Sequence, residues 1–258
     1  MKKLLIRLIG NYNWFRVTIL IKTLFFTRQE KEENKKRQLF YSQFVSPNDL
    51  CFDVGANIGN RITPILNLGA KVVAIEPQKN CYGYLRYKFG EKIEIVTKGL
   101  GESESIKDFY ISDETTISSF SESWIDSVKQ SRFKNSEWNK VEKIEMTTLD
   151  ILIEQYGVPV FIKIDVEGYE LNVLKGLTKP VKMISFEYTV PEQIDKAIDC
   201  ITQINKYNSN VEFNFSALEN MTYSLPKWLL IEDMIKYINS NKFLETGFGD
   251  IYAQTKIK

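Results

Sequence analysis

The sequence predicts an α/β fold in which a mostly parallel, seven-stranded sheet is flanked by helices. Three observations lead to this prediction. Short apolar runs alternate with helical stretches, the first run (residues 50–54) ends in a loop with two glycines, and the composition supports a buried core. Of the 258 residues, 43% are hydrophobic and 26% are charged, which argues against a disordered chain. Strands and helices that alternate in this order form parallel sheets with right-handed crossovers.

The predicted elements follow one another regularly from residue 46 onward. A turn at residues 46–49 comes first, and three of the helices are expected to end at Gly69, Gly90 and Gly176. The strands of the main sheet are predicted at residues 50–54, 71–76, 92–97, 160–165, 182–187, 211–215 and 250–253. Helices are predicted at residues 60–68, 77–89, 151–156, 170–175, 191–206 and 228–238.

An insertion of residues 102–147 interrupts this alternation between the third and fourth strands. It contains two further predicted strands, at residues 107–112 and 141–146, and the aromatic residues Phe120, Trp124, Phe133 and Trp138 between them. The segment is too long for a bare loop, so it is expected to form a lid or an acceptor pocket. We expect its aromatic side chains to form a small satellite core; the alternative is a stacking platform for a sugar ring.

The N-terminal residues differ from the rest of the chain in charge. Residues 1–40 carry a net charge of +7, from ten basic residues and three glutamates, against +1 for the whole chain. The apolar runs at residues 4–9 and 17–26 are too short to span a bilayer, and no signal-peptide cleavage site follows them. We expect one or two helices that pack on the core or on a partner subunit. The alternative is that the protein is cytoplasmic and that residues 1–26 make peripheral contact with the anionic inner surface of the membrane.

The charge run of residues 30–37 predicts a helix with an exposed face. It places Glu32 four residues before Lys36 and Glu33 four residues before Arg37, the spacing at which opposite charges meet on a helix surface.

Several classes of chemistry are excluded by composition. The chain has no histidine, which rules out Ser-His and Cys-His nucleophile systems and histidine-based zinc sites. Cys51, Cys81 and Cys200 lack metal-ligand spacing, so no metal site is predicted and reduced thiols are expected. Nucleic-acid binding is not expected, because the net charge is close to zero. Acid–base chemistry must therefore use carboxylates, lysine, tyrosine, cysteine or water.

The loop after the first strand predicts a nucleoside-cofactor site. Gly55 and Gly59 allow a tight turn and the close approach of a ligand, and Asp53 lies at the mouth of the strand. Glu76 ends the second strand, where a carboxylate can accept hydrogen bonds from both ribose hydroxyls.

The residues between the two glycines favour S-adenosylmethionine over a dinucleotide. Nicotinamide enzymes use G-x-G-x-x-G, whereas Asn57 and Asn60 replace the second and third glycines here. S-adenosylmethionine has no phosphate, and its amino and carboxylate groups need an acid and amide donors, which Asp53 and Asn57 supply. An NAD-dependent oxidoreductase or epimerase of Rossmann type is the disfavoured alternative.

Longer motifs resemble the FkbM family of methyltransferases. The matching pieces are residues 52–59, Glu76-Pro77, residues 98–101, 109–112, 118–120 and 148–150, and above all the Lys163-x-Asp165-x-Glu167-Gly168 segment. The resemblance covers residues 45–190 and a closing strand at 250–253. It implies a Rossmann-like class I methyltransferase domain over residues 46–258, with residues 1–45 as an N-terminal extension. It also implies S-adenosylmethionine as cofactor and O-methylation of sugars, polyketides or other small or glycan acceptors, often in polysaccharide biosynthesis.

The resemblance also implies roles for individual residues. Expected at the cofactor are Asp53, Gly55, Ala56, Asn57, Gly59, Glu76, Pro77, Leu100 and Asp165, with Asp53 and Asn57 at the methionine end, Glu76 at the ribose and Leu100 beside the adenine or in the core. Asp165, Glu167 and Glu187 are the candidate catalytic residues.

These three carboxylates could act as a general base, orient the acceptor hydroxyl or hold a cation. The alternative is a purely structural and cofactor-holding role. Lys163 is expected to compensate Asp165, and Glu170 to begin a helix. Two further function classes stay open. One is a non-catalytic module of a glycan-assembly complex. The other, disfavoured because residues 41–258 sum to −6, is an RNA methyltransferase.

Overall fold

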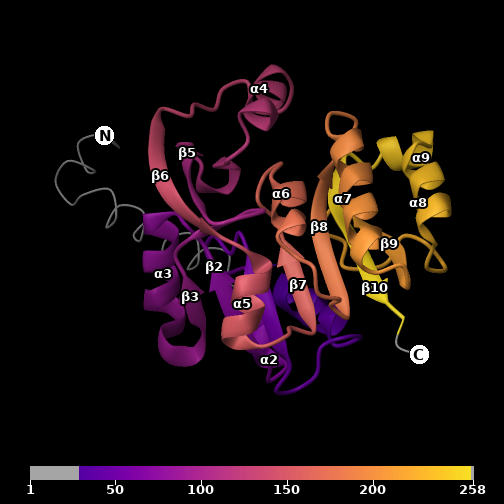
Figure 1. Ribbon diagram of the computed structural model, residues 1–258, viewed down its shortest axis with the longest axis horizontal. Helices are drawn as coiled ribbons and strands as arrows, with labels where there is room; N and C mark the ends of the chain where they lie inside the picture. The colour runs from indigo at the N-terminus through magenta and orange to yellow at the C-terminus, as the bar shows by residue number, and fades with distance from the viewer. Residues whose placement is uncertain (1–28, 257–258) are drawn as a thin grey trace.

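The structure, a computed structural model, describes residues 29–256. Within these residues the chain forms a seven-stranded sheet of order β3-β2-β1-β7-β8-β10-β9 and a three-stranded sheet of order β4-β6-β5 (Figure 1). In the main sheet β1 (Leu50–Val54), β2 (Lys71–Ile75), β3 (Glu94–Val96), β7 (Phe161–Ile164) and β8 (Met183–Thr189) are parallel. The last strand, β10 (Phe248–Thr255), lies antiparallel between β8 and β9 (Val211–Ala217). The predicted mostly parallel α/β fold is confirmed.

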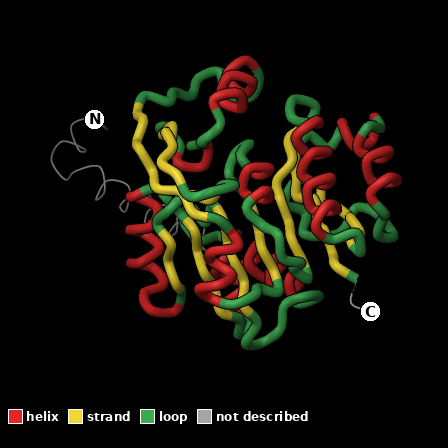
Figure 2. Tube along the Cα trace, in the orientation of Figure 1, coloured by secondary structure: helices red, strands yellow, loops and turns green. Residues whose placement is uncertain are grey.

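Helices cover both faces of the main sheet, because its strands carry apolar side chains on alternate faces. On β1, for example, Phe52 and Val54 face one core and Cys51 faces the other. Figure 2 shows the strands in yellow with the red helices around them. One core lies under α5 (Leu149–Tyr156), α6 (Glu170–Lys175), α7 (Ile194–Tyr207), α8 (Ile231–Ile238) and α9 (Asn241–Leu244). The other lies under α2 (Ile62–Asn67), α3 (Lys79–Phe89) and a helix over residues 29–41.

The helix over residues 29–41 is part of the folded domain. Phe40 and Tyr41 at its end are fully buried in the second core. Its charge run is largely exposed, as the sequence predicted, at Lys31, Glu32, Lys35 and Lys36. The exception is Arg37, which is buried and donates to Glu219 at 2.6 Å instead of pairing with Glu33. Glu33 pairs with Lys36, at 3.2 Å. The prediction for residues 1–26 lies outside the described residues, and none of the helices in residues 29–256 is long and apolar enough to cross a membrane.

The insertion between the third and fourth strands of the main sheet forms the small sheet. β5 (Ser105–Ile111) and β6 (Lys140–Thr147) are an antiparallel pair, and β6 also pairs with the two-residue β4 (Gly99–Leu100). A helix that the sequence did not predict, α4 (Glu122–Gln130), lies between them and is seen above α6 in Figure 1. Two short 3₁₀ helices, η1 (Gly90–Lys92) and η2 (Thr115–Ile117), complete the elements in this half of the chain.

The expected satellite core of the insertion is confirmed. Ile117, Trp124, Ile125 and Val128 are buried together, with Tyr110, Phe133 and Trp138 packed against them. The rings of Phe133 and Trp138 lie 6.3 and 6.5 Å from that of Trp124. These aromatic side chains therefore stabilise the insertion.

Candidate functional site

A cleft of about 1260 Å³ lies at the carboxyl ends of β1, β2, β7 and β8, between the main sheet and the insertion. In doubly wound α/β sheets this edge is where ligands bind. All but one of the residues predicted for the site line the cleft: Asp53, Gly55, Ala56, Asn57, Glu76, Pro77, Leu100, Asp165, Glu167 and Glu187. The exception is Gly59, whose N–H donates to the carbonyl of Ala56 at 2.8 Å and so closes the loop from behind.

The glycine at the end of β1 is required by its surroundings. Gly55 has a φ of +77°, in the left-handed region, and a Cβ atom there would lie 1.8 Å from the carbonyl oxygen of Asp165. The N–H groups of Gly55 and Ala56 donate to the carbonyl of Ile75 at the end of β2. The loop is therefore pinned between β2 and the loop that follows β7.

Asp53 carries a buried carboxylate that has no hydrogen-bond partner within the described residues. Its side chain is 1% exposed, and burial raises its pKa, whereas the charges of Lys163 and Arg61 act in the opposite direction. Buried polar groups are normally hydrogen-bonded, so this carboxylate, which lines the cleft, fits a cationic donor supplied by a ligand. The ammonium of S-adenosylmethionine is such a donor.

Glu76 follows β2, is 2% exposed and is held by two backbone groups. One carboxylate oxygen accepts from the N–H of Gln78 at 2.7 Å and the other from the N–H of Asn57 at 2.8 Å. Burial raises the pKa of Glu76 to about 7, although the two backbone hydrogen bonds act to lower it. Each oxygen keeps a second lone pair, so the group can still accept hydrogen bonds from ribose hydroxyls.

Asn57 and Leu100 are oriented more specifically than the sequence indicated. The side-chain oxygen of Asn57 accepts from Thr115 Oγ1 at 3.5 Å and from Cys81 Sγ at 3.8 Å, which places it between α3 and η2. Leu100 lines the cleft and is also part of the first core, so it is a core residue with one side toward the ligand space.

Three carboxylates lie close together on the wall of the cleft, near the carboxyl ends of β7 and β8. Asp165, Glu167 and Glu187 each have a side-chain oxygen within 4.8 Å of those of the other two. Burial raises the pKa of Glu167 and Glu187 well above the ordinary range, and the neighbouring carboxylates raise it further. Groups this close can share a proton or a cation. Glu187 lies inside β8, which continues to Thr189, rather than at its end.

Lys163 is the cation closest to this group. It is 3% exposed, it forms an ion pair with Asp165 as predicted, and it lies opposite Asp53 in the register of β1 and β7. Burial alone would lower the pKa of Lys163, but the charges of Asp165 and Asp53 outweigh this effect and raise it. The lysine therefore stays charged, paired with Asp165 and opposite Asp53 on the neighbouring strand.

The sequence did not predict Arg61 or Glu219 as residues of the cleft. Arg61 directly precedes α2, and Glu219 follows β9; both line the cleft. Glu219 accepts from Arg61 at 3.2 Å and from Arg37 at 2.6 Å. The position of Arg61 two residues after Gly59 was a usable signal, whereas nothing local in the sequence indicates Glu219.

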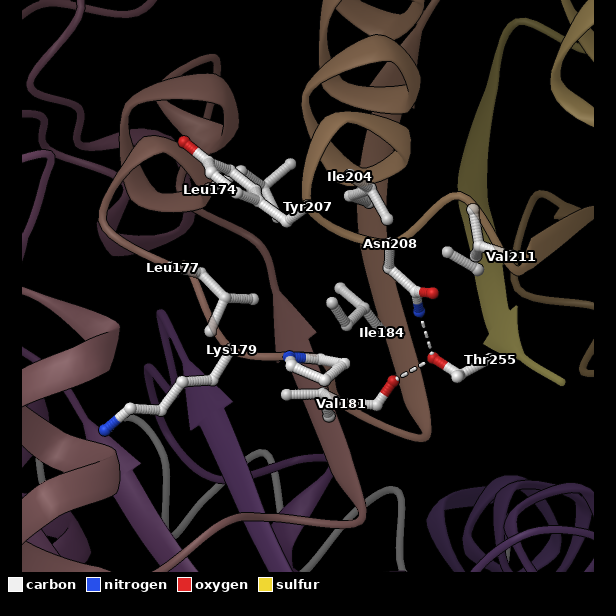
Figure 3. Close-up of a pocket in the computed structure, with 12 residues that line it drawn as sticks. Leu174, Leu177, Lys179, Val181, Ile184, Ile204, Tyr207, Asn208, Val211 and Thr255 are labelled. Carbon is white, nitrogen blue, oxygen red and sulfur yellow. Dashed lines mark hydrogen bonds between the residues drawn. The ribbon is translucent and has the colours of Figure 1, made fainter. Parts of the chain in front are cut away.

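A second, much smaller cavity of about 20 Å³ lies apart from this site, beneath α7 (Figure 3). Apolar side chains such as Leu177, Ile184 and Ile204 point into it, and at its edge Thr255 Oγ1 accepts from Asn208 and donates to the carbonyl of Val181. Its volume holds at most about one water molecule, so it is a packing gap rather than a ligand site.

Solved structures of similar arrangement are methyltransferases of low sequence identity. The precorrin-6Y C5,15-methyltransferase of Geobacter metallireducens has a TM-score of 0.46 at 9% identity, over 85% of this chain and 87% of that one. The TehB-like SAM-dependent methyltransferase of Corynebacterium glutamicum has a TM-score of 0.45 at 8% identity, over 86% and 88%. The O-methyltransferase of Bacillus cereus has 0.43 at 13% identity, over 88% and 81%. Structural similarity at these TM-scores and sequence identities does not define the chemistry of this chain.

The family is established by the sequence itself. No curated protein matches the chain significantly. Residues 53–239 match the family described as the Methyltransferase FkbM domain, from Asp53 in the cofactor loop to the residue after α8. This match covers well over half of the chain and includes most of the residues that line the cleft. The chain therefore belongs to the FkbM methyltransferase family, and its cofactor is S-adenosylmethionine.

Proposed function

We propose that this methyltransferase transfers the methyl group of S-adenosylmethionine to a hydroxyl of a sugar, a glycan or another small hydroxylated acceptor. The observation that carries the proposal is the group of Asp165, Glu167 and Glu187 on the cleft wall, with oxygens within 4.8 Å of one another. A hydroxyl must lose its proton when it is methylated, and with no histidine in the chain a carboxylate is the best placed group to take it.

The electrostatics of the carboxylates suit this role. When bound, S-adenosylmethionine supplies a methyl group already activated by its positive sulfur, so positioning supplies much of the rate. Glu167 and Glu187 have raised pKa values because they are buried beside other acids. A raised pKa makes the ionised form of a carboxylate a stronger base toward an alcohol proton than an ordinary, fully hydrated carboxylate. Asp165, paired with Lys163, is the member of the group best suited to orienting the cofactor or the hydroxyl.

The lining of the cleft supports a polyhydroxylated acceptor. Carboxylates accept hydrogen bonds from adjacent hydroxyls, and the rings of Phe120 and Tyr169, whose centroids are 5.5 Å apart, offer an apolar surface for a sugar face. Phe120 is the one aromatic residue of those predicted for the insertion that lines the cleft; Trp124 and its neighbours form the satellite core. We expect the protein to act in the cytoplasm, on an intermediate of polysaccharide assembly.

The experiment is a screen of acceptors with the purified full chain. Sugar nucleotides, free oligosaccharides and lipid-linked glycans are incubated with S-adenosylmethionine, and S-adenosylhomocysteine is measured, followed by mass spectrometry of the methylated product. Hydroxyl methylation that falls strongly in Glu167→Gln and Glu187→Gln, with little change in cofactor affinity, supports the proposal. Turnover of amine or carboxylate acceptors alone would overturn it. Tight cofactor binding without any turnover would instead indicate the non-catalytic module.

Chelation separates the two roles of the carboxylate group. If the carboxylates act as base and orienting groups, dialysis against EDTA leaves kcat within about twofold of its starting value, because proton transfer needs no cation. A loss of activity that Mg²⁺ restores would contradict this assignment and make the group a cation site.

A further inference from the structure

The loop of residues 165–168 joins β7 to α6 and carries two of the three carboxylates, those of Asp165 and Glu167. Its backbone is left-handed at two successive positions, with φ of +54° at Glu167 and +82° at Gly168. A residue with a side chain rarely adopts this conformation, and it persists only where the surrounding structure imposes it. Contacts with the surrounding structure must therefore hold this loop conformation.

One set of contacts comes from the start of α6. An oxygen of the Glu170 carboxylate accepts from the N–H of Val166 at 3.2 Å and from that of Gly168 at 3.0 Å. These bonds fix the N–H groups of the loop but leave its carbonyl oxygens free to turn.

The carbonyl oxygens are held from outside the loop. Ser119 Oγ of the insertion donates to the carbonyl of Glu167 at 2.6 Å, and Lys196 Nζ of α7 donates to the carbonyl of Gly168 at 3.2 Å. Trp124 packs directly on the loop as well, because a Cβ atom at Gly168 would lie 2.4 Å from its Cδ1. The loop is thus enclosed between the insertion and α7.

Lys196 is the residue that joins these two parts of the molecule. Its ammonium also donates to Ser121 Oγ at 3.3 Å and to Ser123 Oγ at 3.5 Å, at the start of α4, where Ser121 accepts from the N–H of Trp124. This ammonium thus donates to two hydroxyls and one carbonyl, and none of these three partners is a carboxylate. Burial lowers the pKa of Lys196, and the nearby charge of Glu170 opposes the effect. A partly buried lysine with three neutral acceptors is placed for its donors rather than for an ion pair.

We propose that Lys196 is a positioning residue for methyl transfer: it fixes the carbonyl side of the 165–168 loop against the insertion and so aims the Glu167 carboxylate into the cleft. Glu167 is assigned here to the reaction of the proposed function, on which the inference rests. Because the same ammonium contacts α4, the acceptor-facing insertion and the catalytic loop are set in position together. Asp53 and Glu76, which serve the cofactor, lie on other strands and have no bond to Lys196.

The test compares Lys196→Met, which keeps the length of the side chain and removes its donors, with Lys196→Arg, which keeps donors. The control is Lys206→Met, an exposed lysine at the end of the same helix. With an acceptor that the wild-type chain methylates, we expect Lys196→Met to lower kcat by tenfold to about a hundredfold, as for a misplaced reacting group. The KM for S-adenosylmethionine should change by less than about threefold, because Asp53 and Glu76 keep their positions and only Asp165 of the expected cofactor residues lies in the loop. Lys196→Arg should recover most of the loss, and Lys206→Met should have no effect.

A second measurement needs no acceptor. Amide hydrogen exchange on the full chain should be faster at residues 119–125 and 165–169 in Lys196→Met and unchanged at the cofactor loop, residues 53–59. Ser119→Ala should give the same pattern, and the double variant should be less than additive, since both residues hold the same loop. Unchanged exchange at residues 165–169, or a fall in affinity for the cofactor in place of a fall in kcat, would overturn the proposal. If the wild-type chain methylates no hydroxyl, the proposed function fails and the exchange pattern alone decides whether Lys196 holds the loop.

Discussion

Glu76 shows how a single buried carboxyl can couple cofactor binding to pH. Its pKa is raised from 4.5 to about 7 in the folded chain, so between these values the folded state holds a proton that the unfolded state has lost. The stability that Glu76 contributes is therefore greatest below pH 4.5 and is lost as the pH rises through 7. Ribose hydroxyls donate to the ionised form, so binding of the cofactor is expected to favour the deprotonated carboxylate and to lower the pKa of Glu76.

We expect the affinity for S-adenosylhomocysteine, measured by calorimetry, to increase as the pH is raised from 5.5 to 8. Below pH 7 the dissociation constant should fall by up to about tenfold per pH unit, and it should level off above that. Glu76→Gln should weaken binding by roughly tenfold to a hundredfold and flatten this dependence, because the ionised acceptor is gone. An unaltered pH dependence in the variant would show that another group is responsible.

Gly55 offers a second test at the scale of one residue. Gly55→Ala combines a positive φ with a Cβ atom 1.8 Å from the carbonyl oxygen of Asp165, so the loop must move and cofactor binding should be lost. Gly90→Ala is the matched control, since Gly90 also has a positive φ but a Cβ atom there meets nothing within 4 Å. It should cost only about 1–2 kcal/mol of stability and leave cofactor affinity unchanged. Thermal denaturation and calorimetry distinguish the two, and equal effects of both variants would refute the steric explanation.

Among the elements, α4 is held within the insertion by its own small core. Trp124 is 2% exposed and contacts Phe133, Trp138 and the Gly168 backbone. Trp124→Ala should therefore destabilise the insertion by about 3–5 kcal/mol, the usual cost for a buried tryptophan. We expect limited proteolysis to cut the variant within residues 113–139 while the main sheet remains folded. Protection equal to that of the wild type would mean that the insertion is held by other contacts.

The same element shows the limit of sequence patterns. Ser121 as N-cap, followed by Trp124, Ile125 and Val128 on one face, is a helix signal, but it spans only nine residues among polar ones. The strands of the main sheet were easier to predict, because most are short segments rich in apolar residues and bounded by turn residues. Site residues at strand ends followed from the same reasoning, since parallel strands bring their carboxyl ends to one edge. Arg61, Glu219 and Lys196 were missed because their partners lie far away in the sequence.

At the scale of the whole molecule, an ion network ties the N-terminal helix to the cofactor loop. Glu219 is bonded to Arg37 and Arg61 over sequence separations of 182 and 158 residues. Both guanidinium side chains are about 10% exposed, at 9% and 11%, while that of Glu219 is 52% exposed. Removing the Glu219 carboxylate deprives two buried guanidinium groups of a shared ion-pair partner. This lowers the stability of the folded state even though Glu219 itself is partly hydrated.

We expect Glu219→Gln to lower the free energy of unfolding by about 1–3 kcal/mol, less than for a fully buried pair because Glu219 is half exposed. For a chain of this size, this corresponds to a fall in Tm of roughly 2–4 °C per kcal/mol. Glu33→Gln is the control, since its pair with Lys36 lies within one helix turn and should be worth less than about 0.5 kcal/mol. Equal melting temperatures for the two variants would show that the network contributes nothing to stability.

The antiparallel β10 has a consequence for the order in which the protein is built. Because residues 248–255 lie between β8 and β9, β8 pairs on one edge only, with β7, and β9 has no neighbouring strand in the sheet until this segment has left the ribosome. The earlier strands can pair as they emerge, but one edge of β8 and the whole of β9 stay unpaired until β10 has been made. Nascent chains are prone to aggregate through such unpaired edges. Synthesis of the last strand is therefore the step at which a chaperone would matter most.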